Sequence, residues 1–355
     1  MDWKRKKSVV YIKPKSTLQS KIAGFDLDHT LIRPKDGRTY PKDKEDWELY
    51  VPDLKEYLDS LIFEGFSIVI FSNQSSFNDP DKKEIIMSRL EQFINLMEIP
   101  IYVFISTEPD YCRKPNTGMW DEFFGDKSIN LKESFYVGDA AGRTRNPLTK
   151  KKDFSCSDRM FAANLGLKFE TPEKYFLEET FTQKEIFSMP KTWETFPKEQ
   201  PPLDIEDYEV IVLIGPPGSG KSSITESLPD FTVVSRDILR YKAKCIKLMN
   251  DVLKTGGKVI LDNTNPSREA RSDYLSIAKT YGKKVLAVSI NITKEQSMFL
   301  VNYRCKKNKT KRIPDVAIHT FFKKYEKPIK GEGFDKIVER TFVPEGDLPL
   351  FEQYY

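Results

Sequence analysis

The stretch AGFDLDHTLI at residues 23–32 sets two aspartates, Asp26 and Asp28, at the end of an apolar run. Burying an unpaired carboxylate is costly unless a cation or a metal compensates its charge. Because side chains alternate along a strand, the two carboxylates are expected on the same side of the chain. Open parallel sheets bind ligands beyond the carboxyl ends of their strands, so the pair predicts a ligand site at this edge.

Paired carboxylates at a strand end suit phosphoryl transfer. Mg²⁺ prefers carboxylate oxygens, and both Asp26 and Asp28 are candidates to hold it. Asp26 could attack a phosphate as the nucleophile, while Asp28 donates and accepts the proton, in a reaction through an aspartyl-phosphate. Aspartates also commonly cap turns, so this pair alone leaves a purely structural alternative open.

Three later segments end in polar side chains after strand-like runs. IVIFSNQ ends in Ser72 and Asn73, whose hydroxyl and amide suit a phosphate oxygen. YCRKPNTGMW offers Lys114 as a cation for the phosphate, and SFYVGDAAGR offers Asp139 as a further carboxylate for the metal. Each residue has a structural alternative, since Ser72 suits a turn, Lys114 a solvated surface and Asp139 a helix N-cap.

The second half of the chain contains GPPGSGKS at residues 215–222, which fits the pattern GxxxxGK[ST]. The strand-like segment EVIVLI precedes it and the helix-compatible segment SSITESL follows it, as a phosphate-binding loop requires. Backbone N–H groups should surround the β-phosphate of ATP, Lys221 should bridge its β- and γ-phosphates, and the Ser222 hydroxyl should reach Mg²⁺. The residues predicted to bind ATP in this loop are Gly215, Gly218, Ser219, Gly220, Lys221 and Ser222.

Two further segments bear on where the γ-phosphate goes. FTVVSRDIL places Asp237 just after a strand, where it could deprotonate an attacking hydroxyl or, equally, cap the next helix. KVILDNTNPSREA ends a strand at Asp262, in the place of a Walker B acid. RCKKNKTKR at 304–312 predicts a lid or a polyanion-binding strip, in which an arginine could stabilise the transferring phosphoryl group.

The length of 355 residues favours two domains. Strand-like and helix-like segments alternate over roughly the first 180 residues, as in a parallel α/β sheet. Prolines, charges and aromatics interrupt this alternation before a second βα series begins at YEVIVLIG, and Phe187, Trp193 and Phe196 could pack on one domain. We expect a basic N-terminal tail at 1–21, a first α/β domain at 22–180, a linker at 181–207 and a second α/β domain at 208–355.

Composition argues against several classes of protein. No apolar run approaches the roughly 20 residues of a membrane span, so no membrane role is expected. Four cysteines without CxxC spacing predict free thiols, and only two histidines nearly exclude a Ser-His-Asp or Cys-His triad. The net charge is only +4, but basic runs at 4–7, 150–152 and 304–312 favour a polyanionic partner.

The first half resembles the haloacid dehalogenase-type phosphatases and, more closely, the phosphatase domain of eukaryotic polynucleotide kinase 3′-phosphatases. The similarity spans about residues 22–178 and rests on GFDLDHTLI, VIFSNQ, RKPNTGMW, YVGDAAGR and KKKDFSCSDRMFAANLG. It implies that Asp26 is the nucleophile, Asp28 the general acid and base, Ser72 and Lys114 phosphate contacts, and Asp139 and Asp158 ligands of Mg²⁺. His29 departs from the family pattern, which has glycine after the second aspartate.

The second half is similar to the kinase domain of the same proteins over about residues 208–345, through GPPGSGKS, SRDIL, LDNTNPSR and NYR. This resemblance implies that Asp237 is the general base for a 5′-hydroxyl and that Arg304 acts from a lid, with Arg312 as a second lid arginine that contacts ATP. The phosphatase-first order is that of the eukaryotic type. Only residues 1–21 precede the first expected strand, so no docking through the FHA domain of animal members is expected.

Together these resemblances imply a two-domain enzyme that heals DNA strand breaks at nicks, gaps or double-strand ends. It would use Mg²⁺ to remove a 3′-phosphate and ATP to phosphorylate a 5′-hydroxyl, as a monomer in the nucleus. Three alternatives stay open: healing of RNA ends, which depends on 2′-hydroxyl contacts, a small-metabolite phosphatase fused to a metabolite kinase, and a non-catalytic strand-break binding protein. The dense basic stretch argues against the second, and the intact catalytic residues argue against the third.

Overall fold

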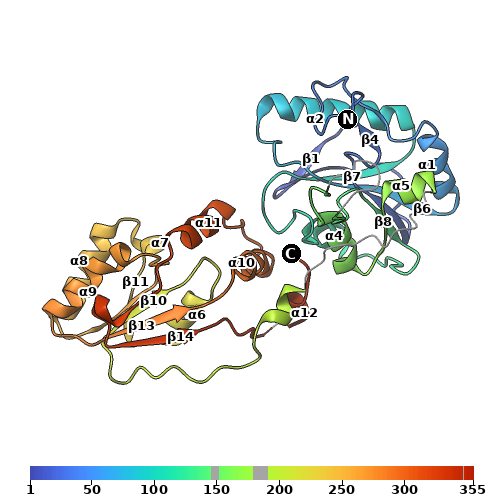
Figure 1. The fold of residues 1–355 in the computed structure, drawn as a ribbon. Helices are drawn as coiled ribbons and strands as arrows, with labels where there is room; N and C mark the ends of the chain where they lie inside the picture. Colours follow the sequence, from blue (N-terminus) through green and yellow to red (C-terminus); the bar gives the residue numbers. More distant parts are fainter. Residues whose placement is uncertain (145–151, 179–190, 347) are drawn as a thin grey trace. The chain divides into compact units, whose positions relative to one another are not determined.

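The computed structural model describes residues 1–144, 152–178, 191–346 and 348–355 and divides the chain into two compact units. Unit 1 comprises Met1–Pro190, Cys305–Arg312 and Gln353–Tyr355, and unit 2 comprises Lys191–Arg304 and Ile313–Glu352. Each unit is an α/β structure built around its own sheet, as the sequence predicts (Figure 1).

Unit 1 contains a seven-stranded sheet in the order β1-β2-β7-β6-β3-β8-β9. Strand β3 pairs in parallel with β6 on one side and β8 on the other, whereas β1 and β2 pair antiparallel at one edge. Strands β6 and β7 are added on one side of β3, and β8 and β9 on the other side. This reversal of strand order makes the carboxyl end of β3 a topological switch point, which favours a ligand site there. The strands of the sheet are β1 (Lys4–Lys6), β2 (Val9–Ile12), β3 (Lys21–Phe25), β6 (Phe66–Asn73), β7 (Ile101–Ser106), β8 (Phe135–Val137) and β9 (Lys168–Glu170), and β4 (Ile32–Arg33) pairs separately with β5 (Glu48–Leu49).

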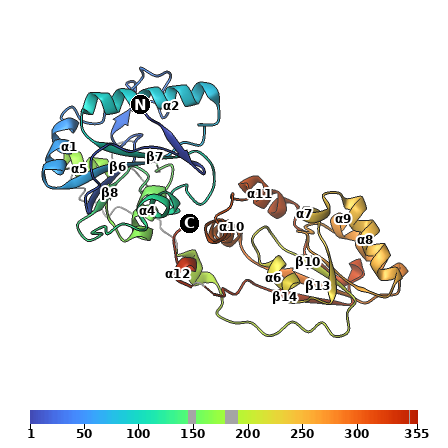
Figure 2. The same cartoon turned by 180° about the vertical axis from the view of Figure 1, so that it is seen from behind.

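Helices cover both faces of this sheet (Figures 1 and 2). One buried cluster joins β3 to α1, α2 and α5, and a second joins the opposite face to α3 and α4. The helices are α1 (Leu54–Phe63), α2 (Pro80–Met97), α3 (Gly118–Phe124), α4 (Ser157–Leu165) and α5 (Pro172–Leu177). Helix α2 begins at Pro80, because the Asp79 carboxylate accepts the N–H groups of Asp81 and Lys82 and Pro80 occupies the first helical position.

Residues 1–21 are not a tail, and this part of the predicted domain layout is wrong. Strand β2 pairs antiparallel with β7, and Val9 is fully buried in the core. The segment VVYI, residues 9–12, has the β-branched and aromatic residues that strands favour, and this signal outweighs the lysines before it. The basic run forms β1 and the hairpin turn, where Lys7 adopts φ 56°.

Unit 2 contains a five-stranded sheet in the order β11-β12-β10-β13-β14, in which every pairing is parallel. Strand β10 is central, so the loop that follows it lies over the middle of the sheet. The strands are β10 (Val210–Ile214), β11 (Phe231–Val234), β12 (Lys258–Leu261), β13 (Val285–Ile290) and β14 (Lys336–Arg340). The helices are α6 (Lys221–Glu226), α7 (Arg236–Leu239), α8 (Lys242–Lys254), α9 (Arg268–Thr280), α10 (Lys294–Asn308), α11 (Asp315–Lys324) and α12 (Leu348–Phe351), with short 3₁₀ turns at Thr192–Thr195 and Lys330–Glu332.

Only residues 191–207 of the predicted linker at 181–207 fall within the described part of the chain. Residues 181–190, and with them Phe187, lie outside the described residues. Residues 191–207 belong to unit 2, where Trp193 packs against Phe299, and Phe196 contacts Phe299 and Phe351. The expectation that Trp193 and Phe196 pack on a domain is therefore confirmed.

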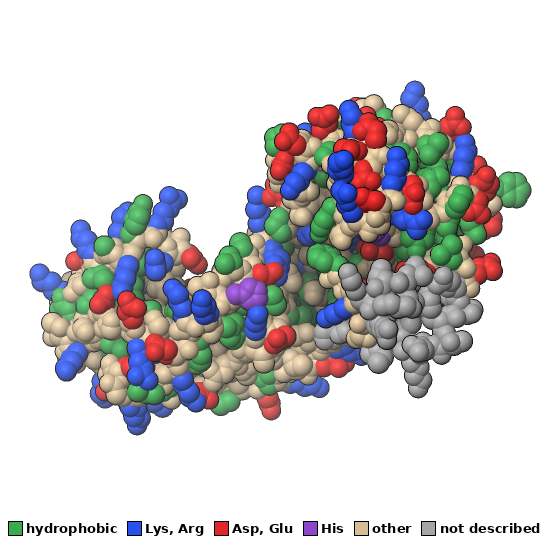
Figure 3. Space-filling model, turned by 45° about the horizontal axis from the view of Figure 1, so that its top comes forward, with side chains coloured by type: hydrophobic (Ala, Val, Ile, Leu, Met, Phe, Trp, Pro, Cys, Tyr) green, Lys and Arg blue, Asp and Glu red, His purple; other side chains and the backbone are tan. Residues whose placement is uncertain are grey.

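Other features follow the composition. All four cysteines are free thiols, and within the described ranges no helix is long and apolar enough to cross a membrane. Figure 3 shows Lys and Arg side chains spread over the visible faces of both units and interspersed with Asp and Glu. Of the three basic runs, residues 150 and 151 lie outside the described part of the chain.

Candidate active sites

The ammonium of Lys114 is the centre of the site in unit 1. Its Nζ donates to Asp26 Oδ1 at 2.6 Å and to Asp158 Oδ1 at 2.7 Å. It also contacts the Phe71 carbonyl oxygen at 2.6 Å and the Tyr136 hydroxyl at 2.8 Å. The Lys114 side chain is only 1% exposed, so these oxygens stand in for the water that a lysine normally binds.

Asp139 completes a group of three carboxylates with Asp26 and Asp158. One oxygen from each lies within 4.8 Å of the others. Lys114 balances one of the three negative charges, which leaves two for a divalent cation. Burial raises the pKa of Asp26 to about 7 and that of Asp139 well above its usual value. A hard cation with oxygen ligands would remove this penalty, so the residues present fit Mg²⁺.

Local structure fixes the two later carboxylates. At Gly138 a β-carbon would lie 2.6 Å from the Asp158 carboxyl carbon, so only glycine fits beside it. The Asp158 Oδ2 accepts the Ala140 N–H at 3.0 Å, and Arg143 Nη2 donates to the Asp139 carbonyl at 3.1 Å. The GD pair of SFYVGDAAGR and the aspartate of CSDR are thereby brought together, as the resemblance implied.

Asp28 does not belong to this group of carboxylates. Its Oδ1 accepts from Arg89 Nη2 at 2.8 Å and its Oδ2 from Gln74 Nε2 at 2.7 Å. Strand β3 ends at Phe25, so the alternation that was expected to align Asp28 with Asp26 no longer applies. The prediction of Asp28 as a carboxylate ligand of the metal is therefore not supported. Its side chain is 31% exposed, so the carboxylate is accessible from solvent.

The polar residues at the end of β6 have distinct roles. Ser72 is buried, and its Oγ accepts from Gln74 Nε2 at 2.9 Å. The Asn73 amide forms two hydrogen bonds with the backbone of Lys114, both at 3.0 Å. Asn73 thus positions the loop that carries Lys114, in place of the phosphate contact that the sequence predicts for it.

Three site residues were missed at the sequence level. Gln74 follows Asn73 directly and could have been included from the same polar run. Arg89 is a charged residue on the apolar side of α2, between Ile86 and Leu90, and this placement was a usable signal. Tyr136 gave none, because a tyrosine inside a strand is read as a core residue.

His29 adopts φ 57°, the left-handed conformation in which glycine is least strained. This backbone requirement explains why a glycine is expected at this position. The ring Nε2 of His29 lies 2.9 Å from the Thr39 carbonyl oxygen, which holds the side chain against the following loop.

The phosphate-binding loop of unit 2 has the expected geometry. Gly218 and Gly220 adopt φ of 78° and 90°, which other residues rarely reach. Helix α6 begins at Lys221, so its N-terminus faces the loop and favours an anion there. The Lys221 Nζ donates to the carbonyl oxygens of Gly215 at 3.0 Å and Pro216 at 2.8 Å.

The acidic residues predicted for this site lie around Lys221. Ser222 Oγ donates to Asp262 Oδ2 at 3.1 Å, which is the pair expected to hold the metal of ATP. Burial lowers the pKa of Lys221 to about 8, and the positive charge of Arg304 contributes to this decrease. The negative charges of Asp262 and Asp237 act to raise the pKa, but they do not outweigh burial. Unit 2 therefore brings together Lys221, Ser222, Asp237, Asp262 and Arg304.

Asp237 is not the N-cap of the helix that follows it, because a neighbouring residue takes that position. Ser235 is the N-cap of α7, and its Oγ accepts the Asp237 N–H at 3.3 Å. The Asp237 carboxylate is exposed and is not needed as the cap. Arg312 falls in unit 1, where its N–H donates to the Pro109 carbonyl at 2.9 Å, so its contact with ATP stays a prediction.

Comparison with known proteins matches both halves of the chain. Residues 21–176 match the family described as polynucleotide kinase 3 phosphatase, and residues 210–328 match an AAA domain. A bifunctional polynucleotide phosphatase/kinase of Schizosaccharomyces pombe is 34% identical over 332 residues, which cover 91% of this chain and 80% of that protein.

Two further relatives differ in how much of this chain they match. A protein of Acanthamoeba polyphaga mimivirus, assigned to the same bifunctional class, is 30% identical over 96% of this chain and 90% of its own length. A polynucleotide 3′-phosphatase of Saccharomyces cerevisiae is 28% identical over 44% of this chain and 87% of its own length. The two bifunctional relatives therefore match most of this chain and most of their own length, whereas the 3′-phosphatase matches less than half of this chain.

Proposed function

This chain belongs to the bifunctional polynucleotide phosphatase/kinase family, and we propose that it heals broken DNA ends by removing a 3′-phosphate and adding a 5′-phosphate. The observation that carries the proposal is the presence of two complete phosphoryl-transfer sites in one chain. One consists of the carboxylates around Lys114, and the other of the loop around Lys221.

In the phosphatase reaction, the Asp26 carboxylate attacks the phosphorus and the bond to the 3′-oxygen breaks. Asp28 gives its proton to the leaving 3′-oxygen and then takes one from the water that hydrolyses the aspartyl-phosphate. Lys114 neutralises the oxygens of the transferred group, and Ser72 orients them. Mg²⁺ bound by Asp26, Asp139 and Asp158 would supply additional charge neutralisation at the phosphate.

In the kinase reaction, Asp237 accepts the proton of the 5′-hydroxyl while that oxygen attacks the γ-phosphorus of ATP. The bond to the β,γ-bridging oxygen breaks and ADP leaves. Lys221 and Arg304 stabilise the charge on the transferring group, and Ser222 with Asp262 would hold the metal of the nucleotide. Because neither site could reach groups inside an intact duplex, strand termini are the fitting substrates.

We extend the proposal to the role of this protein in the cell. A break with a 3′-phosphate and a 5′-hydroxyl cannot be ligated, and the two reactions together make it ligatable. DNA repair at nicks, gaps or double-strand ends, and residence in the nucleus, follow from this role. The basic runs at 4–7, 150–152 and 304–312 support a polyanionic substrate.

Single-site variants test the assignment. Asp26→Ala is expected to abolish 3′-phosphatase activity and spare the kinase, and Lys221→Ala is expected to do the reverse, because the sites use different residues. Both activities are measured on end-labelled oligonucleotides, with Lys55→Ala, which alters an exposed lysine of α1, as the control. If Asp26→Ala retains 3′-phosphatase activity, or if Lys221→Ala retains kinase activity, the assignment of that site is wrong.

A further inference from the structure

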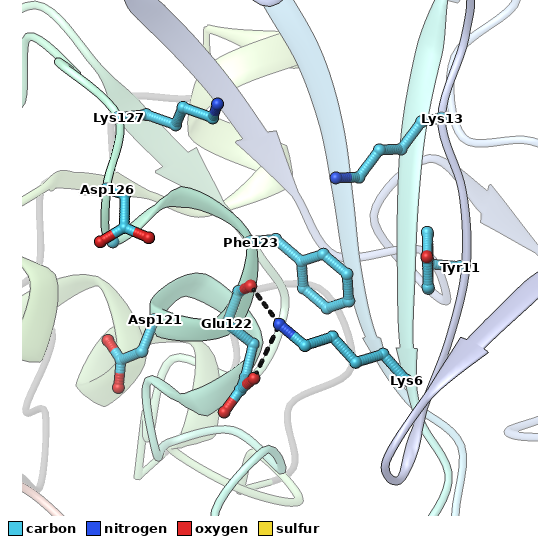
Figure 4. A pocket seen from close by; sticks show the side chains of 9 residues that line it. Lys6, Tyr11, Lys13, Asp121, Glu122, Phe123, Asp126 and Lys127 are labelled. Atoms are coloured by element: carbon cyan, nitrogen blue, oxygen red, sulfur yellow. Dashed lines mark hydrogen bonds and ion pairs between the residues drawn. The ribbon is translucent and has the colours of Figure 1, made fainter.

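A shallow pocket of about 330 Å³ lies in unit 1 between the N-terminal hairpin and the C-terminal end of α3 (Figure 4). Lys6, Tyr11 and Lys13 form its hairpin wall, and Phe123 and Lys127 lie on the opposite wall. This pocket uses the N-terminal basic segment, to which neither reaction assigns a role.

Lys13 and Lys127 extend toward one another from opposite sides of the pocket, beside the ring of Phe123 (Figure 4). The Lys13 Nζ lies 5.0 Å from the Phe123 ring centroid and 5.6 Å from that of Tyr11. No carboxylate forms an ion pair with either lysine among the residues that the structure describes. Partial burial and repulsion from Lys127, Lys6 and Lys4 lower the pKa of Lys13, so an anion between the two ammoniums would be stabilised.

Two of the three acidic side chains of the wall are paired with lysines other than Lys13 and Lys127. Glu122 binds Lys6 at 2.9 Å and Lys7 at 2.7 Å, and Asp121 accepts from Lys306. Asp126 is the remaining carboxylate, and it forms no ion pair within the described ranges. Two ammoniums without an ion pair, those of Lys13 and Lys127, therefore face one such carboxylate, that of Asp126, among the described residues of the wall.

Ammonium groups above aromatic rings match a nucleic-acid strand, because lysines bind the backbone phosphates and aromatic rings stack on bases. We propose that this pocket binds the backbone of a polynucleotide, with Lys13 and Lys127 on a phosphate and Tyr11 and Phe123 against the adjoining sugar or base. The proposal rests on the proposed function and adds a second contact with the same substrate. Lysines also protect sheet edges from aggregation, but Lys13 and Lys127 lie outside the edge strand β1, so that role does not explain them.

The position of the pocket sets which substrates can reach it. Strand β2, which precedes Lys13, lies three strands from β3, which precedes Asp26. At about 4.8 Å per strand the lateral separation is roughly 14 Å. Because β2 runs antiparallel to β7, whereas β7, β6 and β3 are parallel, Lys13 lies toward the amino ends of these strands and Asp26 at the carboxyl end of β3. The full separation therefore exceeds about 14 Å, or about four nucleotides at the helical rise of DNA, so only a longer strand reaches both the active site and the pocket.

The test is the steady-state 3′-phosphatase kinetics of the full chain on a long single-stranded DNA and on a dinucleotide, both with a 3′-phosphate. The double variant Lys13→Ala/Lys127→Ala is expected to raise KM for the long strand several-fold while leaving kcat and the dinucleotide unchanged. Each lost phosphate contact should also reduce the slope of log affinity against log salt by about 0.7. The matched control is Lys21→Ala/Lys55→Ala, which removes two lysines outside the pocket, one of them also over an aromatic ring.

Several results would overturn the proposal. An unchanged KM and salt slope in the pocket variant, or an equal loss in the control variant, would remove the pocket from substrate binding. Competition by poly-glutamate as strong as that by DNA of equal charge would assign it to an acidic protein partner. These results leave wild-type turnover intact, whereas failure of the wild-type chain on both DNA substrates would refute the proposed function itself.

Discussion

Among single residues, Arg89 shows how a side chain away from the phosphate acts on the phosphatase site. It is 2% exposed, and its guanidinium donates to the carboxylate that is proposed to carry the proton. A guanidinium in this position orients Asp28 and compensates its charge in a partly buried setting. Its effect is therefore expected in the chemical step more than in substrate binding.

Replacing Arg89 tests this positioning role. Arg89→Met is expected to lower phosphatase kcat by up to about 100-fold, because Asp28 loses its orientation, with a smaller change in KM and an unaffected kinase. Arg89→Lys should restore part of the rate, because a cation remains. The control is Arg33→Met, which removes an exposed arginine that pairs with Glu48. An equal loss of kcat in Arg89→Met and Arg89→Lys, together with a loss of folded protein in both, would indicate a structural role for Arg89 and contradict positioning.

The pKa of Lys221 predicts how the affinity for ATP depends on pH. Its pKa is lowered to about 8 by burial, and bound ATP, a polyanion, raises the pKa again. Binding is therefore strongest below pH 8, and Kd should rise by at most about tenfold per unit as the pH increases above 8.

Calorimetry of ATP binding with Mg²⁺ across pH 7 to about 9.5 measures this dependence. Lys221→Arg is the matched variant, because arginine stays charged over this range and its Kd should be independent of pH. A Kd of the native chain that is constant across the range would contradict the account.

At the scale of elements, the N-terminal hairpin is tied to α3 by one carboxylate. Glu122 accepts from Lys7 Nζ at 2.7 Å and from the Tyr111 hydroxyl at 2.6 Å, and it also pairs with Lys6. Burial acts to raise the pKa of Glu122, but the hydrogen bonds from Lys7, Tyr111 and Lys6 outweigh it and lower the value to about 2. Folding therefore favours the ionised form.

The variant Glu122→Gln is expected to destabilise unit 1 by about 1 to 2 kcal/mol at neutral pH, less than the full shift because its lysine partners are half exposed. The difference should be present above pH 4.5 and disappear as the pH falls toward 2, since protonation removes the same charge from the native chain. Urea unfolding of both chains at several pH values measures it. Glu98→Gln, which breaks an exposed pair with Lys55, is the control, and a pH-independent difference would contradict the prediction.

The same elements show what the sequence could and could not reveal. The strand ends that carry Asp26 and Asp139, and the loop after β7 that carries Lys114, were predictable, because parallel strands deliver their carboxyl ends to one edge. The side of the chain on which Asp28 falls was not, because it depends on where β3 stops. Strand β2 was missed because the charge of the preceding lysines obscured a β-branched run.

At the scale of the whole molecule, two chemistries reside in units that each have their own sheet and site. Their identities were predictable because each motif is local in sequence: the aspartate pair in one half and the phosphate-binding loop in the other. The assignment of Cys305–Arg312 to unit 1 was not, because it depends on side chains distant in sequence. Cys305 lies in the core cluster of unit 1 with Cys112 and Met119, a grouping that no local pattern indicates.

The central claim is that one chain converts both ends of a strand break. The most direct measurement incubates the protein with Mg²⁺, labelled ATP and a nicked DNA duplex that carries a 3′-phosphate and a 5′-hydroxyl, and follows both termini, with a matched RNA strand alongside. The account predicts loss of the 3′-phosphate and gain of a 5′-phosphate on the DNA. Turnover of RNA alone, or of neither substrate, would contradict it.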